Sequence, residues 1–252
     1  MSVRRSARAL VAIILAALGV SLVGDASAGQ ERRPTVERVL VVSLPTLAWD
    51  ELYRGDTPAL DGLLDGSAVG AMSVRNVLPV TDAEDGYAAM GAGARARGVF
   101  ASGQVLEPQE DFLGTPAGAV YARNTGVTPG DTGLVAFGFP SLVARNGRLD
   151  YGAEVGALGQ ALADAGVPRA AIANADGEGV IEAPMFNRAA ASALIDGNGV
   201  VPAGAVSPAI LELVAEAPYG VALALDVVVS VFDEVWSDGG VVLVEGSDLV
   251  RA

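Results

Sequence analysis

Chemistry in this chain would have to rest on carboxylates, hydroxyl groups and arginines. The sequence has no histidine and no cysteine, and each of its 16 cationic residues is an arginine. These absences exclude a Ser-His-Asp triad, a cysteine nucleophile and any zinc or haem site built from His or Cys. The formal charge of -14 argues against a nucleic-acid partner, because phosphate contacts need a surplus of basic side chains on one face.

Three short motifs contain ligand-binding residue types in an unsuitable context. Gly91, Gly93 and Ala96 nearly match the glycine fingerprint of dinucleotide-binding proteins. They follow a predicted helix, whereas the fingerprint follows a strand. Asp176–Gly179 and Asp196–Gly199 place glycine between polar residues, which is typical of turns. Neither segment has the ligand spacing of an EF-hand.

Four apolar runs are predicted to form strands. Val39–Leu44 (VLVVSL) is continuous, rich in β-branched residues and ended by Pro45. This pattern is typical of a parallel strand buried on both faces, so we expect it near the centre of the sheet. The other predicted strands are Ala68–Val77, Ala170–Ala173 and Val241–Glu245.

Helical signals alternate with these strands. Thr57 and Pro58 supply an N-cap and a first-turn proline for a helix that ends at Gly66. Thr81–Met90 starts with a capping threonine and acids that suit a helix N-terminus. Further helices are predicted over 155–166, 207–217 and 227–236, and the Gly- and Pro-rich stretch 91–148 is predicted to be loops with short elements. The alternation favours one α/β domain: a doubly wound, largely parallel sheet with helices on both faces.

The N-terminal segment has the order of a secretory signal peptide. Met1–Arg8 carries three arginines, Ala9–Gly24 is uncharged and apolar, and Asp25–Ala28 supplies small residues for cleavage. The apolar run is shorter than the ~20 residues that span a bilayer. We therefore expect cleavage and export to the cell envelope or medium; the alternative, an uncleaved anchor, would be the only membrane contact. The predicted organisation is a signal peptide (1–28), a polar tether (29–36) and an α/β domain (37–252).

Four segments together resemble the alkaline phosphatase superfamily, which includes sulfatases, phosphodiesterases and metal-dependent phosphoglycerate mutases. Val39–Asp50 (VLVVSLPTLAWD) is similar to that family's first strand and following turn, and Thr57–Leu63 (TPALDGL) to its T-P-x-L-x-x-L helix. Pro79–Gly93 is similar to the segment carrying the nucleophile, and Leu158–Asn174 to a recurring helix, glycine and strand. The chain looks closest to an exported branch from high-GC Gram-positive bacteria, in which this domain precedes a membrane region, and it looks incomplete at its C-terminus.

The resemblance implies a nucleophile and an anion site. Members of the family attack phosphorus or sulfur with a Thr or Ser at a helix N-terminus, where backbone N–H groups and the helix dipole favour the anion. Thr81 occupies that position, and a plain N-cap is its alternative role. Arg75 and Arg95 flank the same turn and could hold an anionic group, although lone surface arginines are usually solvated.

The metal ligands are where the sequence departs from the family. Members hold two divalent metals with Asp and His, which activate the nucleophile and stabilise developing charge. The family's first-strand Asp would fall at Pro45, and the His four residues after Asp248 would fall at Ala252. A site for Mg²⁺, Mn²⁺, Zn²⁺ or Ca²⁺ would thus rest on carboxylates, with Asp248, Asp82 and Asp85 as candidates. The alternative is that these acids are capping or solvated groups.

These observations predict an exported domain derived from a metal-dependent phosphoester or sulfoester hydrolase. As it stands we expect it to be inactive or incomplete; an active form would be a phosphatase, phosphodiesterase or sulfatase. One alternative is a non-catalytic cell-envelope protein. It would bind an anionic glycan or lipid headgroup in the cleft that holds the catalytic centre in the family. Another is a gene fragment whose metal-binding half and membrane region lie downstream. The expected partner is an anionic small molecule or an envelope component.

Overall fold

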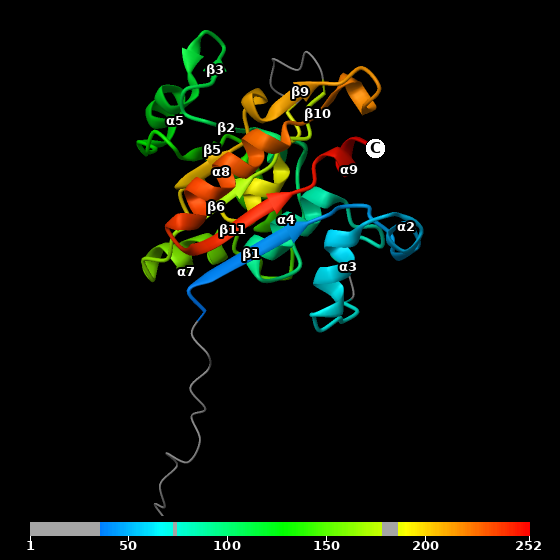
Figure 1. Ribbon diagram of the computed structural model, residues 1–252. Coiled ribbons are helices and arrows are strands. Elements are labelled where there is room, and N and C mark those ends of the chain that lie inside the picture. The colour runs from blue at the N-terminus through cyan, green and yellow to red at the C-terminus, as the bar shows by residue number, and fades with distance from the viewer. Residues whose placement is uncertain (1–35, 73–74, 178–185) are drawn as a thin grey trace, which may run out of the picture. The chain divides into compact units, whose positions relative to one another are not determined.

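Four parallel strands form the main sheet of the protein (Figure 1), in the order β1, β11, β6, β8. The computed structural model describes residues 36–72, 75–177 and 186–252. The strands are β1 (Arg38–Ser43), β11 (Gly240–Glu245), β6 (Arg169–Ile172) and β8 (Ala203–Ala205). Because each neighbouring pair is parallel, the carboxyl ends of all four strands lie along one edge of the sheet.

Short helices and three small antiparallel sheets make up the rest of the described fold. The helices are α2 (Trp49–Arg54), α3 (Pro58–Asp65), α4 (Ala83–Ala92), α5 (Ala117–Thr125), α6 (Phe139–Asn146), α7 (Ala157–Asp164), α8 (Leu225–Ser237) and α9 (Asp248–Arg251). The 3-10 turns are η1 (Phe100–Gly103), η2 (Ala189–Ala193), η3 (Pro208–Ile210) and η4 (Pro218–Gly220). The antiparallel strands are β2 (Val105–Leu106) with β5 (Leu134–Ala136) and β7 (Val200–Val201), β3 (Asp111–Phe112) with β4 (Thr115–Pro116), and β9 (Leu211–Leu213) with β10 (Val221–Leu223).

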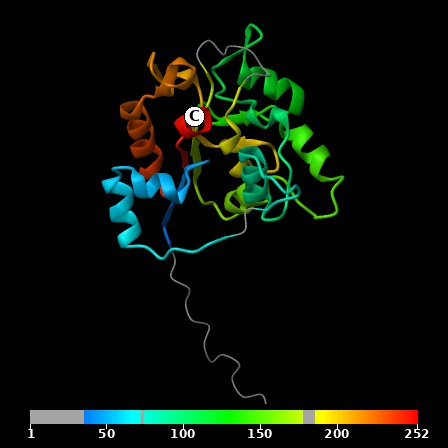
Figure 2. The same cartoon turned by 90° about the vertical axis from the view of Figure 1, so that its right-hand side faces the viewer.

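Helices cover both faces of the parallel sheet, as the alternation of its side chains demonstrates. Ala171 of β6 and Leu243 of β11 point into the larger core, which also contains residues of α4, α7 and η2. The next residues, Ile172 and Val244, point to the opposite face and pack with α8. Successive strand residues point to opposite faces, so α8 lies on one side and α4 and α7 on the other. Figure 2 shows this layering, with α8 in orange and α4 in teal.

Two glycines allow α4 and α7 to approach η2 and the residues after it. A Cβ added at Gly91 would lie 2.9 Å from the carbonyl oxygen of Ser192. A Cβ at Gly159 would overlap the carbonyl of Ile195. The larger core therefore depends on backbone packed directly against backbone at these positions.

Most predicted elements are confirmed. The runs at 39–44, 170–173 and 241–245 are β1, β6 and β11, and four predicted helices are α3, α4, α7 and α8. The mixed α/β character and the parallel sheet are confirmed with them. The stretch 91–148 holds two regular helices, α5 and α6, besides its loops.

Three predictions about the fold are wrong. β1 lies at the edge of the sheet rather than near its centre, because within the described residues it pairs with β11 alone. The described part of 68–77 forms no strand. The Asn76 backbone N–H instead donates to the Thr81 hydroxyl, just before α4, and its side chain donates to the Asp85 carbonyl within α4. The helix expected over 207–217 is a single turn, η3, followed by β9, because pairing with β10 overrides the local capping signal.

The predicted signal peptide (1–28) and most of the predicted tether (up to residue 35) lie in a part of the chain that the structure does not describe. Among the helices that are described, none is both long and apolar enough to cross a membrane.

Candidate functional site at the carboxyl edge of the sheet

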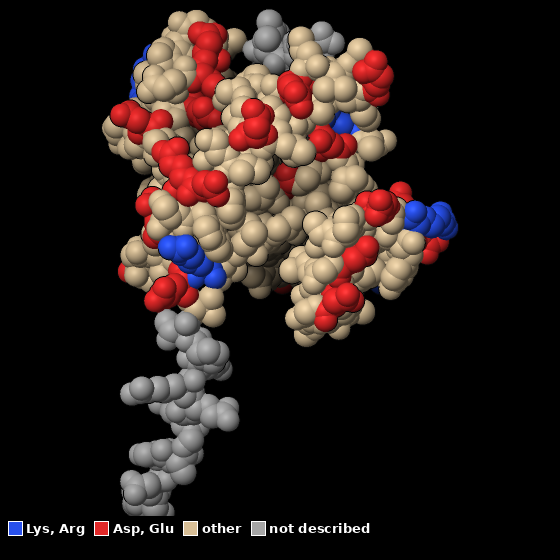
Figure 3. Space-filling view, viewed as in Figure 1, with Lys and Arg blue, Asp and Glu red and all other residues tan. Residues whose placement is uncertain are grey.

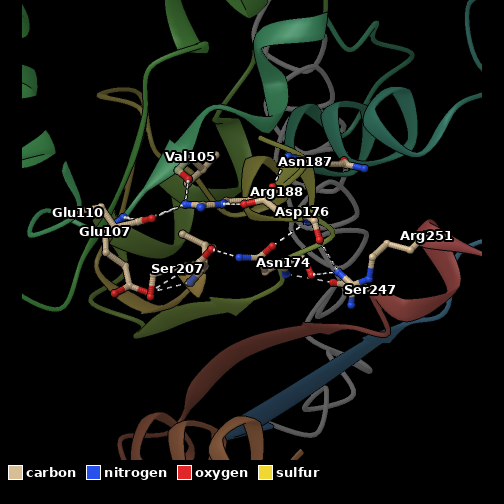
Figure 4. A network of polar contacts seen from close by, with 11 residues as sticks. Val105, Glu107, Glu110, Asn174, Asp176, Asn187, Arg188, Ser207, Ser247 and Arg251 are labelled. Atoms are coloured by element: carbon tan, nitrogen blue, oxygen red, sulfur yellow. Dashed lines mark hydrogen bonds and ion pairs between the residues drawn. The ribbon is translucent and has the colours of Figure 1, made fainter. Parts of the chain in front are cut away.

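The carboxyl ends of the four parallel strands bring polar side chains together. Ser43 ends β1, Glu245 ends β11, and Asn174 and Ser207 each follow their strand by two residues. Open α/β sheets bind their ligands at this edge, which makes it the first place to look for chemistry. Figure 4 shows the part of this edge around Asn174 and Ser207, where the labelled residues form a network of polar contacts.

A chain of hydrogen bonds runs along the β1 and β11 ends of the edge. The Tyr87 hydroxyl, from α4, donates to a Glu245 carboxylate oxygen at 2.7 Å and lies 2.7 Å from the Ser43 hydroxyl. The Ser247 hydroxyl donates to the other Glu245 oxygen at 2.6 Å. The backbone N–H of Asn174 then donates to Ser247 at 3.0 Å, so the chain continues to the end of β6.

Burial perturbs both ionisable groups of this chain. It raises the pKa of the Glu245 carboxyl, although the hydroxyls of Ser247 and Tyr87 lower it in part. Burial, together with the neighbouring Glu245 carboxylate, also raises the pKa of the Tyr87 phenol. Such a carboxyl could hold or pass a proton, but Glu245 is only 4% exposed. The geometry therefore suits an internal hydrogen-bonded link better than an acid or base that meets a substrate.

The final helix, α9, is bound to the same edge by a buried arginine. Arg251 donates to the carbonyl oxygens of Asn174 and Asp176 at 2.7 and 3.2 Å. It also forms an ion pair with Asp248, whose carboxylate accepts the backbone N–H of Leu223 at 3.0 Å. Arg251 thus connects the end of β6 to α9, and Asp248 connects α9 to β10.

Arg188 lies at the centre of the network and is completely buried. Its Nε donates to Asp176 at 2.7 Å, and its Nη1 donates to the two Glu110 oxygens at 2.8 and 2.9 Å. Nη1 also donates to the carbonyl of Val105 at 3.1 Å, and the guanidinium lies 4.3 Å above the ring of Phe186. One cation therefore joins two carboxylates and the backbone carbonyl of Val105, the first residue of β2.

The electrostatic balance at Arg188 is incomplete. Burial raises the pKa of Glu110 despite the nearby guanidinium, which lowers it. The Nη2 of Arg188 is buried and has no hydrogen-bond partner among the described residues. Both features mark a site where desolvation is costly and pairing offsets only part of that cost.

The Glu107 carboxylate binds two backbone N–H groups that follow the end of β8. One of its carboxylate oxygens accepts the backbone N–H groups of Val206 and Ser207, both at 2.9 Å. Two convergent N–H groups before a helical turn are the arrangement that binds phosphate or sulfate in many proteins. Here the acceptor is a side chain of the protein itself.

The predicted nucleophile lies at the start of α4. Thr81 directly precedes Asp82, the N-cap residue of that helix, and its hydroxyl accepts the backbone N–H of Asn76 at 3.0 Å. Asp82 is exposed and its side chain caps no backbone N–H. The placement at a helix N-terminus is therefore the predicted one, and the bond from Asn76 to Thr81 is a contact within the loop before α4.

The predicted metal ligands do not form a metal site. Asp85 is buried and pairs with Arg97 at 3.3 Å, whereas Asp248 pairs with Arg251 in α9. In the part of the chain that the structure describes, no three acidic, His or Cys side chains group so as to hold a metal ion. The residues present thus do not fit the two-metal centre of the superfamily that the sequence resembles, because Asp85 and Asp248 are each paired with an arginine.

The two predicted anion-binding arginines lie on the surface. Arg75 is exposed next to the buried Asn76. Arg95 is exposed, with its guanidinium 5.7 Å from the centre of the Tyr151 ring. Neither residue belongs to the network of Figure 4.

The residues that make up the network were not among those predicted from the sequence. Glu245 had a usable signal, because it is the polar end of a predicted parallel strand and such ends converge. Arg188 also had one, since it begins an alanine-rich apolar stretch and has to be paired if that stretch is buried. Glu107 and Tyr87 had no local signal, because their roles depend on partners far away in the sequence.

Comparisons with family models, with curated proteins and with solved structures find no match to this chain.

Proposed function

We propose that this chain is an exported, non-catalytic domain of the alkaline phosphatase type, in which the edge that would hold the catalytic centre serves to stabilise the fold. The parallel sheet with helices on both faces agrees with the doubly wound architecture that the resemblance implies. The proposal is carried by one observation: the acids of the carboxyl edge, buried and half-buried, are bound by arginines, hydroxyls and backbone N–H groups of the chain itself.

The energetics of the nucleophile support this proposal. A threonine hydroxyl without a base or metal stays protonated at neutral pH, and a helix dipole offsets only about 0.3–1 kcal/mol. Metal ions in related chemistry contribute several kcal/mol of charge stabilisation. The Thr81 hydroxyl accepts the Asn76 N–H, and among the described residues no three acidic side chains group so as to hold a metal ion.

The arginines of the edge are also poorly placed to bind an external anion. Arg188 and Arg251 are 0% and 5% exposed, and each is paired with an acid. Glu107 occupies the N–H pair at the end of β8. An incoming phosphate or sulfate would have to displace these internal partners, which favours a structural role for the edge over the alternative of anion binding.

The test is a hydrolysis assay on the purified chain and its Thr81→Ala variant. Substrates are p-nitrophenyl phosphate, bis(p-nitrophenyl) phosphate and p-nitrophenyl sulfate, each with EDTA or with Mg²⁺, Mn²⁺, Zn²⁺ or Ca²⁺. Thr132→Ala, at an exposed threonine, is the matched control. We expect all three proteins to give the rate of the corresponding metal blank. Metal-dependent turnover that Thr132→Ala retains and Thr81→Ala loses would contradict the proposal and establish a carboxylate-only metal site.

A further inference from the structure

β1 has the composition of an interior strand and the position of an edge strand. Its sequence is RVLVVS, and among the described residues it pairs only with β11. Val39, Leu40 and Val42 are 42%, 43% and 50% exposed. Parallel strands with apolar side chains on both faces are normally covered on both sides, and edge strands normally carry charges, prolines or bulges that discourage pairing. Within β1 only Arg38 carries a charge.

The unpaired side of β1 presents a defined set of backbone groups. The carbonyls of Glu37 and Ser43 accept N–H groups from the β11 side, at 2.9 and 2.8 Å. Because alternate residues of a strand direct their N–H and C=O groups to opposite sides, the residues between them with even numbers face outward. Leu40 and Val42 therefore offer their N–H and C=O groups at the open edge.

The side-chain layer over this edge is open too. Val42 is in register with Val244, which packs on the α8 side of the sheet. The main contacts of α8 with the sheet are to β11, β6 and β8. On β1 its C-terminal end contacts Arg38, whose guanidinium donates to the Ser237 carbonyl and lies near the Trp236 ring, while Val42 stays half-exposed. The neighbouring helix α3 has no buried residue, and its Leu63 is 60% exposed. In Figure 3 the surface over the middle of β1 is uncharged, with charged side chains near its N-terminal end, and the surface is hollowed between β1 and the arm formed by α2 and α3.

Acidic side chains flank this uncharged surface on both sides. Exposed acids lie on α2 and α3 (Asp50, Glu51, Asp61 and Asp65) and on α8 (Asp226, Asp233 and Glu234). Figure 3 shows them in red on the arm and on the body of the protein. A second copy of this chain would bring the same acids against them. On β1, α2, α3 and α8 the described cations are Arg38 and Arg54, and Arg54 is already paired with Asp50. The charges therefore disfavour self-pairing and favour a partner with basic residues.

We propose that the open edge of β1 binds a β-strand of another protein, apolar along its length and flanked by Lys or Arg. The strand would bond to the outward groups of Leu40 and Val42 and extend the sheet, as in other cases of strand addition. The flanking cations would face the acids of α3 and α8. The inference does not depend on whether the chain is catalytic, because it concerns a different surface.

The experiment uses the purified chain and a synthetic peptide with a Val/Ile run between pairs of lysines. The same peptide with glutamates in place of the lysines tests the charge argument. Val42→Pro removes one N–H that points outward and blocks the close approach of another strand. The hydrogen bonds between β1 and β11 are made by the odd-numbered residues of β1, so this substitution leaves them in place. Val42→Thr keeps the N–H and the β-branched shape and is the matched control. Binding is measured by fluorescence anisotropy, folding by circular dichroism, and oligomeric state by light scattering after gel filtration.

We expect a monomer that binds the lysine peptide, and binding that weakens as salt is added. Val42→Thr should bind about as well as wild type, and Val42→Pro about tenfold or more weakly. The glutamate peptide should bind more weakly than the lysine peptide. If Val42→Pro unfolds, Leu40→Lys replaces it, because a charge on the edge also opposes strand addition. Equal binding by wild type and a folded edge variant would overturn the proposal. So would a dimer that an edge variant dissociates, since the occupant would then be a second copy.

Discussion

Replacing Arg188 by methionine should remove the main electrostatic link of the carboxyl edge. Methionine approximates the length of the arginine stem and suits an apolar site, so the change removes charge and hydrogen bonds more than volume. It breaks the contacts to Asp176 and Glu110 at 2.7 and 2.8 Å. It leaves both carboxylates in place, with side chains 2% and 15% exposed.

The expected loss of unfolding free energy is about 3–5 kcal/mol, the range for removing one partner of a buried ion pair. The cost arises because the remaining carboxylates keep their desolvation penalty and lose the cation that offset it. That penalty is visible in Glu110, whose pKa is raised by burial even with Arg188 present. Since a domain is stabilised by about 5–15 kcal/mol in total, the variant should be close to unfolding at moderate urea.

Urea unfolding followed by circular dichroism measures this loss at pH 7. The variant Arg188→Met/Asp176→Asn/Glu110→Gln should recover most of it, because amides at those two positions carry no charge to leave unpaired. Arg54→Met is the control, since Arg54 pairs with Asp50 at the surface, where both side chains are more than three-quarters exposed; its cost should stay within about 1 kcal/mol.

The defect of Arg188→Met should also shrink as the pH falls. Carboxyls whose pKa is raised in the folded protein favour folding below their unfolded pKa and oppose it as the pH rises through the folded pKa. A loss of less than about 1 kcal/mol at pH 7, or a triple variant no more stable than Arg188→Met, would refute the view that Arg188 compensates two buried charges.

Three further predictions concern other parts of the chain. Because the pKa of Glu245 is raised in the folded protein, wild-type stability should fall as the pH rises from about 4.5 through the folded pKa. Glu245→Gln should lack this fall. Equal slopes of the urea midpoint against pH for the two proteins would contradict the prediction. Gly159→Ala should cost about 1–3 kcal/mol through overpacking against Ile195, whereas Gly62→Ala, with nothing within 4 Å, should be neutral or stabilising in thermal unfolding. N-terminal sequencing of exported protein should begin at Gly29, and an intact Met1 would argue for an uncleaved segment.

The types of the main elements were predictable because their signals are local. The continuous β-branched run of β1, the first-turn proline of α3 and the periodicity of α3 and α7 depend on residues close together in the chain. Local signals failed where a distant strand competes for the same backbone. The Ser207–Pro208 start supports only the turn η3, because residues 211–213 pair with 221–223 to form β9 and β10.

The candidate site was predictable only in part. That polar residues after parallel strands converge is a general property of such sheets, and Glu245 and Asp248 lie at the end of a predicted strand. Their partners could not be deduced, because Tyr87 reaches Glu245 across 158 positions of the chain. Asp248 was predicted as a metal ligand from the resemblance to the alkaline phosphatase superfamily, and the structure pairs it with Arg251, three residues later in α9.

Composition and local pattern establish which chemistries are excluded, which segments are strands or helices, and that the domain is α/β. These properties need no knowledge of which segments meet. The order of the strands, the open edge of β1 and the pairing of Arg188 are set by contacts between distant residues. A buried charge must find its counter-charge wherever the folded chain brings one near, and a strand becomes central or peripheral only when its neighbours are known.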